Sequence, residues 1–68
     1  MRIRGHALTR WIARAPLGLN HIEDLLLAAT TGRVVREEGG TRWVVGLGMV
    51  LVIRHNVVIT CWRANRKR

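Results

Sequence analysis

Three basic side chains near the start of the chain have the types and the spacing that phosphate chemistry needs. His6, Arg10 and Arg14 stand four residues apart, so a helix stacks them along one face. Cleavage of RNA by its own 2′-hydroxyl needs a proton acceptor, a proton donor and cations around the phosphate. We take the three as candidate catalytic residues, with His6 as acid or base and the arginines as a phosphate clamp. A plain solvent-exposed helix face has the same pattern, and that alternative stays open.

Two further residues complete the candidate catalytic set. His55 falls in a predicted turn and is the candidate second acid or base. Thr60 falls in a predicted strand, where its hydroxyl could bind phosphate. Each also has an ordinary structural explanation, because turn histidines are commonly solvated and β-branched residues fill strand positions. His21, in the first turn of a predicted helix, is expected to be a solvent-exposed neighbour of the helix cap.

The chain is strongly basic, with 12 Lys and Arg against 4 Asp and Glu and a net charge of +8. This charge predicts an anionic partner, either RNA or another nucleic acid, or an acidic protein such as an antitoxin or a host target. Trp11, Trp43 and Trp62 could stack on splayed bases, but core packing is the favoured expectation. The candidate nucleic-acid-binding residues are Arg2, Arg4, Arg10, Arg14, Arg66, Lys67 and Arg68.

Several kinds of site and location are disfavoured. Cys61 is the only cysteine, so neither an intramolecular disulfide nor a cysteine metal cluster can form, and we expect no metal and no cofactor. The longest uncharged run, 43–53, is well short of the ~20 residues that span a bilayer, so no membrane partner is expected. The polar residues Arg2, Arg4, His6 and Arg10 stand where a signal peptide needs its apolar region, so we expect no export by that route and a cytoplasmic location.

The first half of the chain has the apolar periodicity of helices. A first helix is predicted over 6–15, closed by Pro16 and Gly18. A second is predicted from an N-cap at Asn20 to Gly32. The residues expected to form the buried stripes are Leu8, Trp11, Ile12 and Ala15 in the first helix and Ile22, Leu25, Leu26 and Ala29 in the second.

The second half is rich in Val, Ile, Thr and Trp, which favour strands. The predicted strands cover 33–38, 41–45, 47–54 and 57–63, with turns at 39–40, 46–48 and 55–56. The predicted fold class is α+β, with two N-terminal helices packed on a four-stranded antiparallel sheet. We expect one small domain over 1–68, ending in a basic tail at 64–68. Because 49–53 is apolar on both faces, self-association as a homodimer is also expected.

Three segments of the chain have recognisable short motifs: His6-Ala7-Leu8-Thr9-Arg10 with Arg14, the helix from Ile22 to Gly32 with its Ile-Glu-Asp start, and the final strand from Val57 to Thr60. Together they resemble a family of small bacterial and phage proteins of unknown function. This family looks like a minimal form of the ribonuclease-like fold of barnase, EndoU, colicins and the RelE/ParE toxins. The resemblance covers nearly the whole chain.

The resemblance implies two helices on a four-stranded antiparallel sheet, with nucleic acid bound on the exposed sheet face or at the edge made by the first helix. Carried over residue by residue, it points to His6, Arg10, Arg14 and Thr60. The chain has no Tyr and one Lys, at position 67, so the RelE-type catalytic set is missing.

Two functions therefore compete. One is a toxin-like, metal-independent ribonuclease, or a relative of one that binds RNA through a basic helix face. The other is a non-catalytic phage-type or regulatory protein that binds and inhibits an acidic host protein or a nucleic acid.

Overall fold

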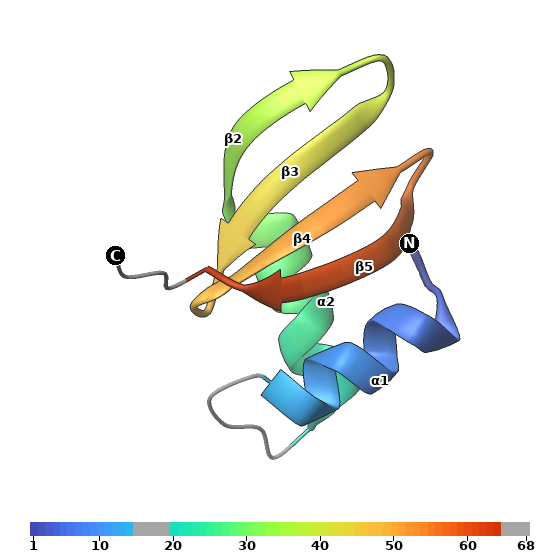
Figure 1. The fold of residues 1–68 in the computed structure, drawn as a ribbon, viewed down its shortest axis with the longest axis vertical. Coiled ribbons are helices and arrows are strands. Elements are labelled where there is room, and N and C mark those ends of the chain that lie inside the picture. The colour runs from blue at the N-terminus through green and yellow to red at the C-terminus, as the bar shows by residue number, and fades with distance from the viewer. Residues whose placement is uncertain (15–19, 65–68) are drawn as a thin grey trace.

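The structure, a computed structural model, describes residues 1–14 and 20–64. Its elements are β1 (Arg2–Ile3), α1 (Gly5–Arg14), α2 (His21–Thr31), β2 (Arg33–Glu38), β3 (Thr41–Gly46), β4 (Met49–Arg54) and β5 (Val57–Arg63) (Figure 1). Two helices and one sheet confirm the α+β class. The predicted helix end and breakers at 15–18, and the tail residues 65–68, lie outside the described residues.

The four predicted strands form an antiparallel meander, as expected. The strand order is β1-β5-β4-β3-β2, and each pair from β2 to β5 is antiparallel. Two-residue turns join these strands, and all of their central residues have positive φ angles, which matches the twist of paired strands. Those residues are Gly39 and Gly40, Leu47 and Gly48, and His55 and Asn56.

The sheet has five strands rather than the predicted four, and it is mixed rather than wholly antiparallel. The additional strand, β1, runs parallel to β5, with Arg2 opposite Val57 and Ile3 opposite Val58. The backbone N–H of Arg2 donates to the Asn56 carbonyl oxygen, and that of Arg4, the residue after β1, donates to the Val58 carbonyl oxygen, both at 3.0 Å. A two-residue strand is too short to show an alternating pattern, so the sequence does not indicate β1.

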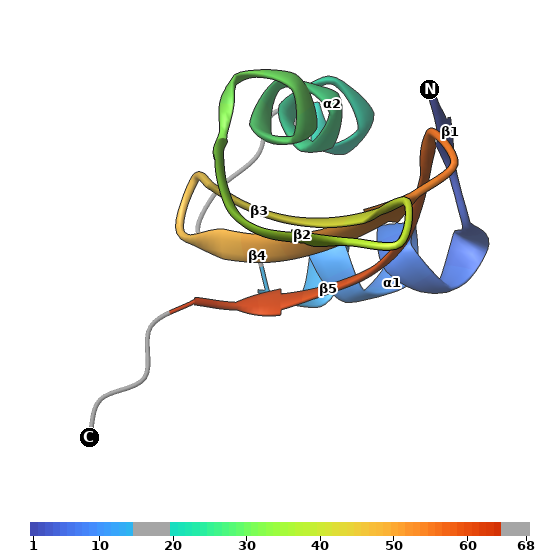
Figure 2. The same ribbon diagram turned by 90° about the horizontal axis from the view of Figure 1, so that it is seen from above.

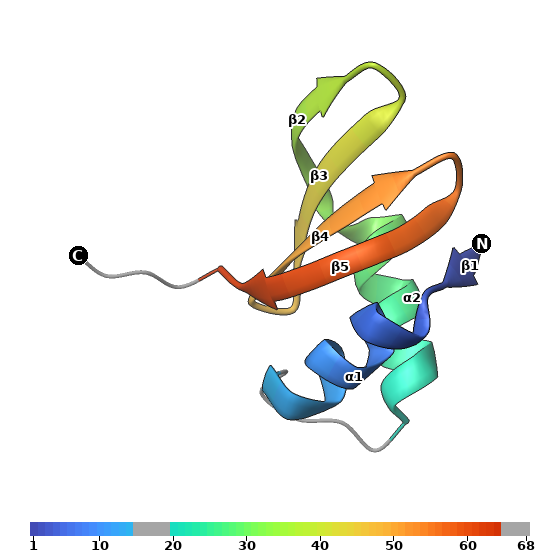
Figure 3. The same cartoon turned by 45° about the vertical axis from the view of Figure 1, so that its right-hand side comes forward.

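One face of the twisted sheet packs against both helices. Figure 2 shows α2 across this face, and Figure 3 shows α1 beside β5 and close to α2. In β4, the alternate residues Met49, Leu51 and Ile53 are buried on this side. The buried core consists of Ala7, Trp11, Leu25, Ala28, Ala29, Val44, Met49, Leu51, Ile53, Val58 and Cys61.

The helix boundaries agree with the prediction to within two residues, but the prediction of which helix residues are buried is partly wrong. Asn20 is the N-cap of α2, and its Oδ1 accepts from Glu23 N at 3.1 Å, as expected. Ile12 and Ile22, predicted to be buried, are each 50% exposed. The predicted exposure of His21 is also wrong, because its side chain is half-buried and Nδ1 is enclosed without a hydrogen-bond partner among the described residues.

The cause of the shifted stripe in α2 is its close approach to β3. A Cβ atom added at Gly46 would lie 2.8 Å from the Ala28 carbonyl oxygen, and one added at Gly32 would lie 2.5 Å from the same oxygen. The helix therefore packs with its small residues Ala28 and Ala29 against the sheet, and the larger Ile22 turns away.

No helix among the described residues covers the other face of the sheet, which we call the open sheet face. The strand register places its residues opposite the buried set, since Val44, Leu51 and Cys61 share the helix side. It carries Trp43, Val45, Val50, Val52, Thr60 and Trp62. Trp11 lies in the core as predicted, but Trp62 is 38% exposed and Trp43 is half-buried, so core packing does not describe these two. No helix among the described residues is long and apolar enough to cross a membrane.

Candidate nucleic-acid interface

The position of α1 is fixed by its contacts with β5. Ala7 and Trp11 are fully buried, and the Cys61 thiol donates to the Ala7 carbonyl oxygen at 3.4 Å. At the start of the helix, β1 ties the chain to the first residues of β5. The helix contact follows from the sequence, because small and aromatic residues one helical turn apart present one apolar strip to the strand.

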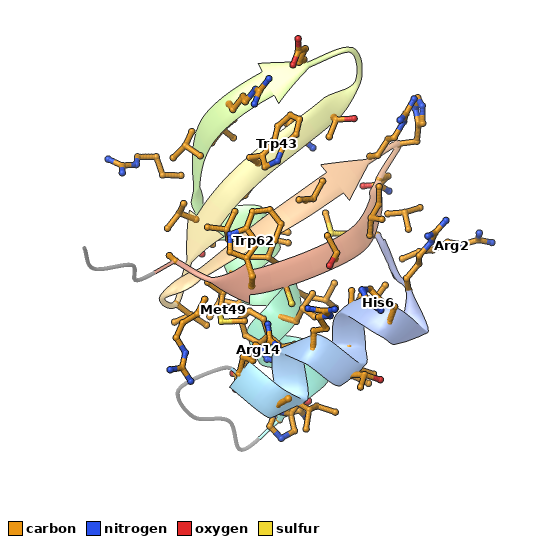
Figure 4. The ribbon with its side chains drawn as sticks, in the orientation of Figure 1. Arg2, His6, Arg14, Trp43, Met49 and Trp62 are labelled. Atoms are coloured by element: carbon orange, nitrogen blue, oxygen red, sulfur yellow. The ribbon has the colours of Figure 1, made fainter. Side chains whose placement is uncertain are left out.

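The predicted basic row lies beside that strip. Arg10 is three residues and Arg14 seven residues after Ala7, so both stand on nearly the same side of the helix as Ala7. Arg10 is half-buried, whereas His6 and Arg14 are exposed. Figure 4 shows His6 and Arg14 on the side of α1 that looks toward β5. The structure thus brings together three of the five predicted catalytic residues.

The charge of this row acts on the buried thiol of β5. Burial raises the pKa of Cys61 above its usual value, and the positive charges of Arg10 and Arg14 offset part of that rise. Arg10 and Arg14 therefore belong to one electrostatic environment at the junction of α1 and β5.

Arg63 is a third cation at the same junction. Its Nη2 atom donates to the carbonyl oxygen of Arg14 at 3.4 Å, at the C-terminal end of α1, where a cation is favoured by the helix dipole. We call Arg10, Arg14 and Arg63 the α1–β5 arginine cluster. The sequence does not single out Arg63, because its role depends on β5 ending beside the last turn of α1.

The arginine cluster has no carboxylate partner among the described residues. Within 1–14 and 20–64, the one ion pair joins Arg36 to Glu38, with 2.7 Å between nitrogen and oxygen. The acidic residues lie elsewhere, in the first turn of α2 and at the end of β2. The cluster is therefore a site of uncompensated positive charge that suits a phosphate group.

The two remaining predicted catalytic residues lie on other elements. His55 is in the β4–β5 turn, and its ring atoms lie 3.4 to 3.9 Å from the place where a Cβ of Gly40 would be. No hydrogen bond or ion pair within 1–14 and 20–64 joins His55 to α1. Thr60 is half-buried on the open sheet face, one residue from Cys61 and on the opposite side of the strand.

The other predicted nucleic-acid-binding residues fall into two groups. Arg2 and Arg4 are exposed on either side of Ile3, and Figure 4 shows Arg2 at the outer edge of the molecule, beyond His6. They extend the basic surface past the start of α1. Arg66, Lys67 and Arg68 lie outside the described residues.

Comparison with protein-family models, with curated proteins and with solved structures finds no match to this chain. Among residues 1–14 and 20–64, no three His, Cys, Asp or Glu side chains gather into a group that could hold a metal ion.

Proposed function

We propose that this chain is a toxin-like ribonuclease that binds single-stranded RNA at the α1–β5 arginine cluster and cleaves it without a metal ion. The observation that carries the proposal is the placement of charge. Glu23 and Asp24 stand in the first turn of α2, Glu37 and Glu38 stand on β2, and among the described residues none of these four side chains forms an ion pair with the cluster. An RNA phosphate supplies the missing negative charge, and planar guanidinium groups bind it in bidentate fashion.

The proposed reaction is transfer of the phosphate to the neighbouring ribose hydroxyl. His6 accepts the proton of the 2′-hydroxyl, the 2′-oxygen attacks phosphorus, and the bond from phosphorus to the 5′-oxygen breaks. The leaving 5′-oxygen takes a proton from the imidazolium or from water, which gives a 2′,3′-cyclic phosphate and a free 5′-hydroxyl. Arg10 and Arg14 stabilise the charge that builds on the phosphate oxygens. His55, on the far turn, is not needed in this scheme.

The open sheet face supports binding of unstacked bases. Trp43 and Trp62 lie on β3 and β5, two strand spacings apart and offset by two residues, which separates their Cα atoms by about 12 Å. Bases stacked in a helix are about 3.4 Å apart, so the two indole rings fit bases that have left the stack. Arg36 lies over the Trp43 ring at 4.7 Å and adds a cation to that platform.

The toxin-like character of the proposal rests on the resemblance of the His6 to Arg14 segment and of the last strand to the family described above. A second candidate function, non-catalytic capture of an acidic protein, is favoured by one observation. The positive charge of the α1–β5 arginine cluster, which has no ion-pair partner among the described residues, also suits the carboxylates of an acidic protein.

Labelled single-stranded RNA in EDTA tests the proposal. The wild-type protein should release fragments with 2′,3′-cyclic phosphate ends, and RNA binding should quench the emission of the exposed Trp62. Binding with quenching but without such ends would leave an RNA-binding protein and remove the enzyme. Failure to bind RNA at low salt, together with capture of an acidic protein, would replace the proposal by the second candidate.

A further inference from the structure

The outer strand β2 is the one part of the sheet where opposite charges lie close together along the chain. Its sequence is Arg-Val-Val-Arg-Glu-Glu, so its two cations and two anions cancel, whereas the whole chain carries +8. Two copies of a chain with this net charge repel each other unless they meet at a locally neutral surface. A self-contact is therefore least opposed along β2.

The order of charges on β2 is complementary to itself in one direction. Its first residue is Arg33 and its last is Glu38, so an antiparallel second copy places Arg33 opposite Glu38 and Glu38 opposite Arg33. Opposite charges that face each other across two strands stabilise the pair, and like charges destabilise it. A parallel arrangement in register would instead place Glu37 and Glu38 beside their own copies.

The irregularity in β2 makes this antiparallel register sterically consistent. Residues five apart in a regular strand point to opposite faces, and they could not meet across a twofold axis. The register shift between Val34 and Arg36 changes that alternation, since Arg33 pairs with Val45 and Glu38 pairs with Thr41, both on the open sheet face. Val34 and Glu37, paired with Val44 and Arg42, both stand on the helix side and would also face each other.

The exposed apolar surface of β2 adds to the argument. Val34 is 46% exposed and Val35 is 50% exposed, and pairing with another strand removes part of this surface from water. Edge strands with free backbone groups are templates for such pairing, and the charges here disfavour other registers.

We propose that β2 pairs antiparallel with β2 of a second copy, around a twofold axis, to form a dimer with one continuous ten-stranded sheet. Glu38, already bonded to Arg36 of its own chain, then gains the guanidinium of Arg33 from the other copy. The interface is small, so the dimer forms at micromolar or higher concentration and dissociates on dilution. The proposal does not depend on RNA binding.

Charge exchange tests this dimer by sedimentation at low salt. The variants R33E and E38R each place like charges in register, so each should weaken self-association about tenfold or more relative to the wild type. The double variant R33E/E38R restores opposite charges and should dimerise like the wild type. A mixture of the two single variants should form a heterodimer, because each strand then faces only opposite charges.

The matched control is E23R, which makes the same change of charge as E38R at the first turn of α2, away from β2. It should leave the dimer within about twofold of the wild type, and circular dichroism should show that each variant is folded. A wild-type chain that is monomeric at several hundred micromolar would overturn the proposal. So would a dimer that R33E, E38R and E23R all weaken equally, which would indicate an interface elsewhere, such as the open sheet face.

Discussion

The two edges of the sheet are built in opposite ways. At the β5 edge, α1 and β1 cover the strand, and the arginine cluster has no acidic partner among the described residues. At the β2 edge no other described strand pairs with the outer side of β2, but each type of charge has a neighbour of the opposite sign, as in the pair of Arg36 with Glu38. The fold therefore separates a covered edge with free positive charge from a bare edge with balanced charge. We assign the first to RNA and the second to another copy of the chain.

The largest expected effect concerns the chemistry at the covered edge. His6→Ala should lower the rate of cyclic phosphate formation by about 10²- to 10⁴-fold, the usual contribution of a general acid or base, and leave RNA affinity within about twofold. His55→Ala is the matched control and should change the rate little, because His55 lies on the β4–β5 turn against Gly40. Equal losses for both variants would contradict the assignment of proton transfer to His6 alone.

The next effect concerns stability at the two edges. Trp11 fastens α1 to the core and is fully buried, so Trp11→Ala should lower the free energy of unfolding by about 3–5 kcal/mol. Val35 is exposed on β2, so Val35→Ala should lower the free energy of unfolding by less than about 0.5 kcal/mol. Urea unfolding of dilute protein measures both. A similar loss for the two variants would mean that the edges do not differ as described.

A smaller effect follows from the buried thiol at the covered edge. Burial raises the pKa of Cys61 in the folded state, so the folded protein keeps this proton to higher pH than the unfolded chain does. The thiol of the unfolded chain ionises at about pH 8.5. Below that pH the contribution of Cys61 to the free energy of unfolding is fully present, and it declines as the pH rises toward the pKa of the thiol in the folded protein. Cys61→Ala should remove the decline. The test is the urea midpoint of both proteins at neutral and alkaline pH. A Cys61→Ala variant whose midpoint falls with pH as steeply as that of the wild type would contradict this explanation.

Local patterns accounted for most of the fold. Turn residues such as Gly39-Gly40 and the N-cap Asn20 act over a few residues, and their elements were predicted almost to the residue. What the sequence did not indicate depends on contacts between distant segments. β1 pairs with residues more than fifty positions away, and Ile22 is exposed because Ala28 approaches Gly46 closely.

The candidate site divides in the same way. His6, Arg10 and Arg14 could be grouped from helical spacing alone, and Figure 4 shows His6 and Arg14 on one side of α1. Arg63 could not be grouped with them from the sequence, because it joins the cluster only through the contact between the end of β5 and the last turn of α1. The exposure of Trp62 depends on which face of β5 turns toward the helices, and a strand with apolar residues on both faces does not reveal this.

The central claim is that Arg10 and Arg14 of the covered edge bind phosphate, whereas Arg33 of the bare edge and Arg42 of the neighbouring strand β3 do not. The measurement is the affinity for single-stranded RNA as a function of salt, at nanomolar protein, for Arg10→Ala/Arg14→Ala and for Arg33→Ala/Arg42→Ala, which remove equal charge. The first pair should weaken binding strongly and reduce the log–log salt slope by about 1.4, since each lost contact to a single strand removes about 0.7. The second pair should leave the slope nearly at its wild-type value. Equal changes for the two pairs would show that RNA responds only to net charge, and would contradict the account.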